Sequence, residues 1–195
     1  AGVSDAQLSG TDRERLKGAT QEFLAAQALN ADRPEARATL GGFYARQGQA
    51  GAAEAEYKAA LRLSPAFGPA AANLADLYRQ LGRDAEAESV LRQAIQASPK
   101  DAGLHHALGL TLVRLKRQDE ALAEFARAAE LEPDRARYAY VHAVALDASG
   151  RRADAIQALK DNLARHPADH DTLSALISFN RDAGDVTAAL TYAEQ

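Results

Sequence analysis

Five histidines, with the scattered aspartates and glutamates, are the residues of this 195-residue chain that could bind a metal ion or transfer a proton. His106 and His142 are expected on neighbouring helices, where a shared metal ion is conceivable. Neither has a histidine or carboxylate three or four residues away, the helical spacing that would complete a site. We therefore interpret His142 as a core histidine held by a hydrogen bond, and we expect no metal site.

The other candidates for chemistry have structural interpretations. His166 and His170 flank Pro167 in HPADHD, which has the composition of a polar turn between helices. Acidic pairs such as Asp119-Glu120 fall in first turns of helices, where they favour the positive end of the helix dipole. No strand is predicted that could carry a nucleophile elbow, a P-loop or a dinucleotide-binding loop. The sequence predicts no catalytic residues and no cofactor.

Composition excludes further classes. Hydrophobic residues make up 47% and charged residues 26%, with a formal net charge of -4, as in a folded globular protein. Basic residues are interspersed with acidic ones, which argues against a nucleic-acid surface. There is no cysteine for disulfides or thiolate zinc sites, and no apolar run is long enough for membrane insertion. The chain lacks an initiator methionine, so we expect a processed chain or a fragment of a larger protein.

A 34-residue period organises the chain, because Pro65, Pro99, Pro133 and Pro167 follow one another at that interval. Four complete repeats are predicted, each a helix–turn–helix unit. The predicted segments are a loose leader at 1–10, a partial repeat with only its second helix at 11–33, the repeats 34–67, 68–101, 102–135 and 136–169, and a truncated fifth repeat at 170–195. The helix of the partial repeat is expected from about Thr11, capped by Thr11 or Asp12, to Asn30.

The residue types found at several positions of the repeat have a physical reason. Positions 8 and 20 hold mostly glycine or alanine, which lets the two helices of a repeat approach closely. Positions 7, 11 and 24 hold mostly bulky apolar residues on the facing sides of the helices. Position 15 holds glycine in four repeats, which suits a left-handed residue in the turn, whereas Lys116 stands there in the third repeat. Proline at position 32 ends the second helix.

The stretch Ala107–Pro133 carries the most complete set of these residues, with Leu108 at position 7, Gly109 at 8, Ala121 at 20, Phe125 at 24 and Pro133 at 32. This spacing resembles the tetratricopeptide repeat (TPR) family over nearly the whole chain. The resemblance implies an all-α fold, a right-handed superhelix of antiparallel helix pairs.

The resemblance also implies that positions 2, 5, 9, 12 and 13 of the first helices line a concave partner-binding groove. The residues singled out there are Arg79, His106, Leu110, Val113, Arg114, Tyr140, Val144, Asp147 and Arg181. Leu110, Val113, Tyr140 and Val144 would form an apolar floor with a charged rim. By residue type Tyr140, Arg79 and Arg114 are the best hot-spot candidates. The alternative is that Leu110 and Val144 only pack between neighbouring helices.

Two narrower resemblances concern the partner and the location of the protein. Chaperone-binding arrays clamp a peptide carboxylate with lysine at position 5 and asparagine at position 9, but His106 and Leu110 stand there in the third repeat. Tails of Hsp70 and Hsp90 are therefore disfavoured partners. Phrases such as Asn73–Glu88 and Arg137–Arg151 resemble the C-terminal arrays of bacterial multihaem c-type cytochrome proteins. That likeness would imply a periplasmic location; without it, the sequence is compatible with the bacterial cytoplasm or the periplasm.

The sequence predicts a protein–protein interaction scaffold that binds a peptide or partner protein in its groove, within a larger bacterial protein. One alternative is self-assembly into homo-oligomers through the terminal repeats. Another is the repeat portion of a periplasmic electron-transfer protein, although the chain has no C-x-x-C-H site for haem.

Overall fold

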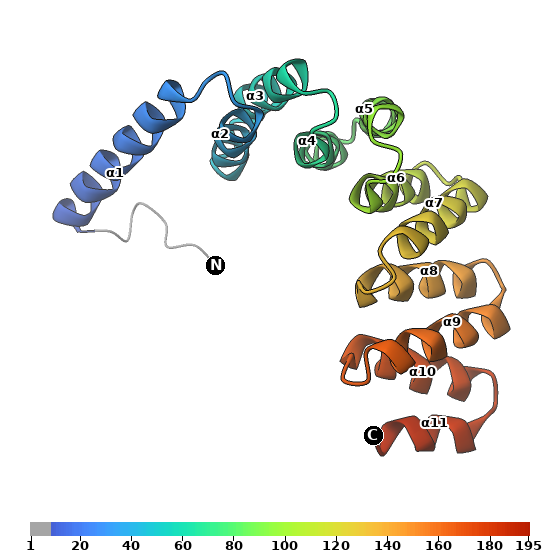
Figure 1. Cartoon of the computed structure of the whole chain (residues 1–195). Helices are drawn as coiled ribbons and strands as arrows, with labels where there is room; N and C mark the ends of the chain where they lie inside the picture. The colour runs from blue at the N-terminus through green and yellow to red at the C-terminus, as the bar shows by residue number, and fades with distance from the viewer. Residues whose placement is uncertain (1–8) are drawn as a thin grey trace. The chain divides into compact units, whose positions relative to one another are not determined.

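The computed structural model describes residues 9–195, which form eleven α-helices and no strand (Figure 1). The helices are α1 (Gly10–Leu29), α2 (Pro34–Arg46), α3 (Ala50–Leu63), α4 (Gly68–Gln80), α5 (Asp84–Ala97), α6 (Ala102–Arg114), α7 (Gln118–Leu131), α8 (Ala136–Ala148), α9 (Arg152–Arg165), α10 (His170–Asp182) and α11 (Val186–Ala193). The predicted all-α repeat fold is confirmed.

Helix ends follow the repeat. The first helices of successive repeats, α2, α4, α6, α8 and α10, begin 34 residues apart. The second helices α3, α5, α7 and α9 each end two residues before a proline, because proline disfavours helical geometry in the residue that precedes it. The start of α1 differs from the prediction: Ser9 is the N-cap, and its Oγ accepts a hydrogen bond from Asp12 N at 3.2 Å. The rest of the predicted leader, residues 1–8, lies outside the described residues.

The turn inside each repeat needs one left-handed residue. Gly48, Gly82, Gly150 and Gly184 have φ between 72° and 84°. Lys116 occupies the equivalent position of the third repeat with φ 59°, and it is the one positive-φ residue other than glycine among residues 9–195. The turn geometry of the fold therefore prevails over the local preference of lysine.

Contacts divide the chain into two compact units, with the boundary after Leu74, within α4. In the first unit α2 packs on α3, where a Cβ atom on Gly41 would lie 2.7 Å from Tyr57 Cδ1. The rings of Phe23 and Phe43 lie 5.0 Å apart and join α1 to α2. Close approach at Gly41 is what the small residue at position 8 predicted.

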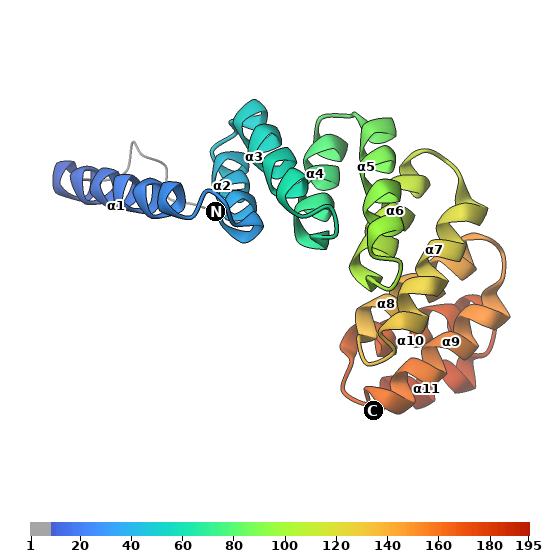
Figure 2. The ribbon, with the colours of Figure 1, turned by 45° about the horizontal axis from the view of Figure 1, so that its top comes forward.

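In the second unit, Ala75–Gln195, helices α6 to α11 each pack against the next along the chain (Figures 1 and 2). Gly109 of α6 faces Phe125 of α7 in the same way as Gly41 faces Tyr57. Further along, Ala143, Leu146, Ala155, Leu159, Ala175 and Leu176 form one buried apolar cluster. Its members come from α8, α9 and α10, so the interior is shared between neighbouring repeats.

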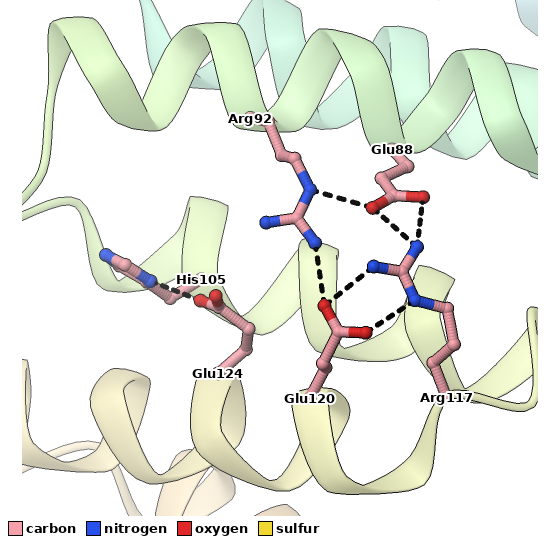
Figure 3. A network of polar contacts seen from close by, with 6 residues as sticks. All are labelled: Glu88, Arg92, His105, Arg117, Glu120 and Glu124. Atoms are coloured by element: carbon pink, nitrogen blue, oxygen red, sulfur yellow. Dashed lines mark hydrogen bonds and ion pairs between the residues drawn. The ribbon is translucent and has the colours of Figure 1, made fainter.

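Charged side chains join repeats in addition to this apolar interior. One group, named here the α5–α7 network and drawn in Figure 3, consists of Glu88 and Arg92 of α5, His105 of α6, Arg117 of the following turn, and Glu120 and Glu124 of α7. Arg117 Nη1 donates to Glu88 Oε2 at 2.7 Å, and its Nη2 donates to Glu120 Oε2 at 2.6 Å.

Arg92 reinforces the same link, because its Nε donates to Glu88 Oε1 at 2.7 Å and its Nη2 to Glu120 Oε2 at 3.1 Å. Burial raises the pKa of Glu88, but hydrogen bonds from Arg92 and Arg117 outweigh it and bring the pKa below its usual value. His105 Nδ1 lies 2.6 Å from Glu124 Oε2. Two arginines thus share two glutamates across the α5–α7 junction (Figure 3).

Candidate functional site

The nine predicted groove residues all lie on first helices of the second unit. Arg79 is on α4, and Arg181 is on α10; α6 carries His106, Leu110, Val113 and Arg114, and α8 carries Tyr140, Val144 and Asp147. We call this set the first-helix surface.

Three aliphatic side chains of the first-helix surface are exposed. Leu110 is 36% exposed, Val113 47% and Val144 39%, although the neighbouring Leu108, Leu112 and Leu146 are buried. Tyr140 is half-buried and packs against the apolar cluster of α8, α9 and α10. The apolar residues of this surface therefore retain area that a partner could cover.

Arg79 and Arg114 are in direct contact with each other, and both have partners within the stack. Arg79 Nη1 donates to the Ala107 carbonyl of α6 at 3.1 Å, and its Nη2 donates to Asp76 Oδ1 at 2.8 Å. Arg114 Nε donates to Asp84 Oδ1 at 2.6 Å, and its Nη2 donates to the Arg79 carbonyl at 3.3 Å. The Arg79 side chain is only 14% exposed, so it fixes α4 to α6.

His106 is half-buried between aromatic rings. Its ring centroid lies 5.0 Å from that of Tyr138 and 5.8 Å from that of Phe125, and its Nδ1 is buried without a hydrogen-bond partner in the described part of the chain. Burial lowers the pKa of His106 to about 4, helped by the charges of Arg137, Arg79 and Arg135. The ring is therefore neutral near pH 7.

The remaining charges of the first-helix surface also form ion pairs. Arg152 Nε donates to Asp147 Oδ1 at 2.6 Å. Arg181, at the far end, lies 3.1 Å from Asp182. With these pairs formed, the aliphatic side chains are the groups of this surface that have most to gain from a partner.

The histidines of the described residues do not form a metal-binding cluster. No group of three histidines or acidic residues in residues 9–195 is placed to hold a metal ion. His142 is half-buried, and burial together with Arg151 lowers its pKa. The hydrogen bond predicted for His142 is not found among the described residues, and His142 is one of the residues that line a cleft beside α7 and α9. None of the described helices has the length and apolar character needed to cross a bilayer.

The repeat sequence matches a known family. A family model described as tetratricopeptide repeat matches residues 11–167, and a second model with the same description matches residues 140–195. The chain belongs to the TPR family. No curated protein matches it in a sequence comparison.

Solved TPR-like structures share this fold at low identity. The crystal structure of MamA is 19% identical, covers 83% of this chain and 88% of its own, and has a TM-score of 0.68. YrrB, described as a TPR protein with an unusual peptide-binding site, is 20% identical over 88% of this chain and 89% of its own, at 0.64. PilF of Pseudomonas aeruginosa is 20% identical over 93% and 83%, at 0.72. The likeness to cytochrome-associated arrays stays a prediction.

Reading the sequence one helix face at a time missed two features of this TPR protein. The first is the pairing of Arg79 and Arg114 with the backbone and acids of other helices. The second is a cleft on the second helices α7 and α9, away from the predicted surface. Comparing positions 21, 23 and 25 between successive repeats would have indicated the cleft, because long charged residues there are replaced by apolar ones 34 residues later.

Proposed function

We propose that this TPR protein is a non-catalytic scaffold that binds a peptide or a partner protein on the first-helix surface. The observation that supports this is the exposure of Leu110, Val113 and Val144 on α6 and α8, at 36%, 47% and 39%. Aliphatic groups on an otherwise ion-paired surface gain free energy when a partner covers them, at about 25 cal/mol for each Å² buried. Tyr140 adds an aromatic side chain of the kind enriched in hot spots.

The partner can be trapped where it binds. A photoreactive phenylalanine analogue is introduced at Leu110 or Val144, and cross-linked products are identified after irradiation of the cells that make the protein. A matched control places the analogue at Gln96, an exposed residue of α5. The proposal expects one product shared by Leu110 and Val144 that is missing at Gln96. Equal products at all three positions would count against it.

A second candidate function is self-assembly through α11. Val186 is 58% exposed and Leu190 59%, on the last helix of the described chain. Light scattering over a concentration series separates the two functions, because self-assembly predicts an oligomer without any partner, whereas the scaffold proposal predicts a constant mass. Substitution of Leu190 by aspartate should abolish such an oligomer.

A further inference from the structure

A cleft of about 600 Å³ lies on the second-helix side of the third and fourth repeats. Its lining comes from α7, α8, α9 and the turn before α9: Asp119, Leu122, Ala123, Ala126, His142, Leu146, Arg151, Asp154, Gln157, Ala158 and Asp161. Most of its exposed lining is apolar. None of the nine residues of the first-helix surface takes part in it.

The cleft stands one repeat after the α5–α7 network of Figure 3. Adding 34 to Glu88, Arg92 and Glu124 gives Leu122, Ala126 and Ala158, so three long charged side chains are replaced by apolar ones. His105 is likewise replaced by Ala139. These replacements remove side-chain volume from the junction and leave the hollow open.

Two charged residues of the network have charged counterparts 34 residues later in the chain. Arg117 corresponds to Arg151, and Glu120 corresponds to Asp154. Arg151 Nε donates to Asp154 Oδ2 at 2.8 Å, as Arg117 does to Glu120 at 2.6 Å. In the network, Arg92 supplies Glu120 with a second guanidinium at 3.1 Å. Among the described residues, the α7–α9 junction has no such second guanidinium beside Asp154, because Ala126 stands in the place of Arg92.

The lining has an excess of negative charge. The lining includes three acidic residues, Asp119, Asp154 and Asp161, and one basic residue, Arg151. Asp161 accepts a hydrogen bond from Gln157 at 2.9 Å, but this bond does not neutralise its charge. Apolar walls with unbalanced carboxylates at the rim are complementary to a cation on an apolar segment.

We propose that the α7–α9 cleft binds an arginine-bearing apolar segment of a partner polypeptide. The arginine takes the place against Asp154 that Arg92 takes against Glu120, and Asp119 and Asp161 add attraction. The apolar part of the segment covers Leu122, Ala126 and Ala158. Arginine fits better than lysine, because its planar fork can bind one carboxylate beside the existing Arg151 pair.

A phage-displayed library of 12-residue peptides, selected on the full chain, tests this. A parallel selection uses Ala126→Arg, which restores the side chain of the network and fills the cleft from within. The proposal expects peptides recovered only with the unmodified chain to be enriched in arginine flanked by aliphatic residues. Recovery of the same peptides with both proteins, cleft-dependent peptides without arginine enrichment, or no cleft-dependent peptide at all would overturn it.

Dissociation constants of the selected peptides then localise the binding. We expect at least tenfold weaker binding to Ala126→Arg and to Asp154→Asn, and unchanged binding to Val113→Ala, which alters an exposed side chain of the first-helix surface outside the cleft lining. Thermal melts establish that each variant is folded. Ala126→Met, which fills the cleft without adding a charge, replaces Ala126→Arg if the latter is unfolded. Equal affinity for all four proteins would overturn the proposal.

Discussion

Gly109 and Phe125 are matched in size, because a Cβ atom on Gly109 would lie 2.5 Å from Phe125 Cε1. The same two repeat positions vary together through the chain: Gly41 with Tyr57, Ala75 with Leu91, Ala143 with Leu159, and Ile177 with Ala193. A smaller residue on the first helix accompanies a larger one on the second, and the reverse holds in the last pair. The two positions thus divide a similar total side-chain volume in three ways along the chain: glycine with an aromatic ring, alanine with leucine, and isoleucine with alanine.

Gly109→Ala is therefore expected to lower the free energy of unfolding by about 1–3 kcal/mol, since the ring of Phe125 has to move. The double variant Gly109→Ala/Phe125→Leu recreates the pair found at Ala143 and Leu159 and should recover most of that loss. Urea unfolding of the two single variants and the double variant measures the coupling. Additive losses would contradict the matched packing.

Lys116→Gly should stabilise the protein. Lys116 has φ 59°, a conformation that costs an L-residue about 1–2 kcal/mol, whereas glycine loses about 0.5–1 kcal/mol in chain entropy. A net gain of about 0.5–1 kcal/mol follows. The matched control is Gly150→Lys, at φ 78°, which should lose a similar amount. Thermal unfolding measures whether each substitution raises or lowers the stability. A destabilised Lys116→Gly would show that the lysine side chain has a stabilising role.

Acidification should destabilise the fold through His106. Its pKa is lowered from 6.5 to about 4 in the folded chain, so between these values the unfolded chain binds a proton that the folded chain does not. The associated stability is complete above pH 6.5 and is lost as the pH falls toward 4. Because the ring is partly exposed, we expect about 1 kcal/mol between pH 7 and pH 5.

The matched variant is His106→Gln, which cannot take up this proton. Its midpoint of thermal unfolding should fall less than that of the unmodified chain between pH 7 and pH 5. Parallel losses in both proteins would contradict the assignment, and an NMR titration of the His106 ring measures the pKa directly.

Arg79 is expected to matter for stability more than for partner binding. Arg79→Met removes the hydrogen bond to the Ala107 carbonyl and should lower the free energy of unfolding by about 1–2 kcal/mol. Arg114→Met, whose side chain is 49% exposed, should lose less. Urea unfolding compares the two variants, and equal or reversed losses would be inconsistent with the buried position of Arg79.

The repeat itself could be predicted from the sequence because the residues that determine it lie close together in the chain and recur in each repeat. Proline sets the end of each second helix, glycine supplies the left-handed turn residue, and small residues at positions 8 and 20 mark the close contact. Lys116 shows the strength of this pattern, since a lysine adopts the conformation that glycine takes in the other repeats.

The surface features described above could be predicted from the sequence only in part. The exposure of Leu110, Val113 and Val144 follows from their place on α6 and α8. The bonds of Arg79 depend on how its long side chain reaches α6, and a helical pattern does not specify this rotamer. The α7–α9 cleft arises where residues 34 positions apart differ in length, so it becomes visible only when repeats are compared side by side.

The proposed function requires a partner that binds the aliphatic side chains of the first-helix surface. The most direct measurement is the dissociation constant of the cross-linked partner for the unmodified chain and for Leu110→Asp/Val144→Asp, with thermal melts to establish that the variant is folded. We expect at least tenfold weaker binding to the double variant and unchanged binding to Gln96→Asp. Equal affinity of the partner for all three proteins would contradict it.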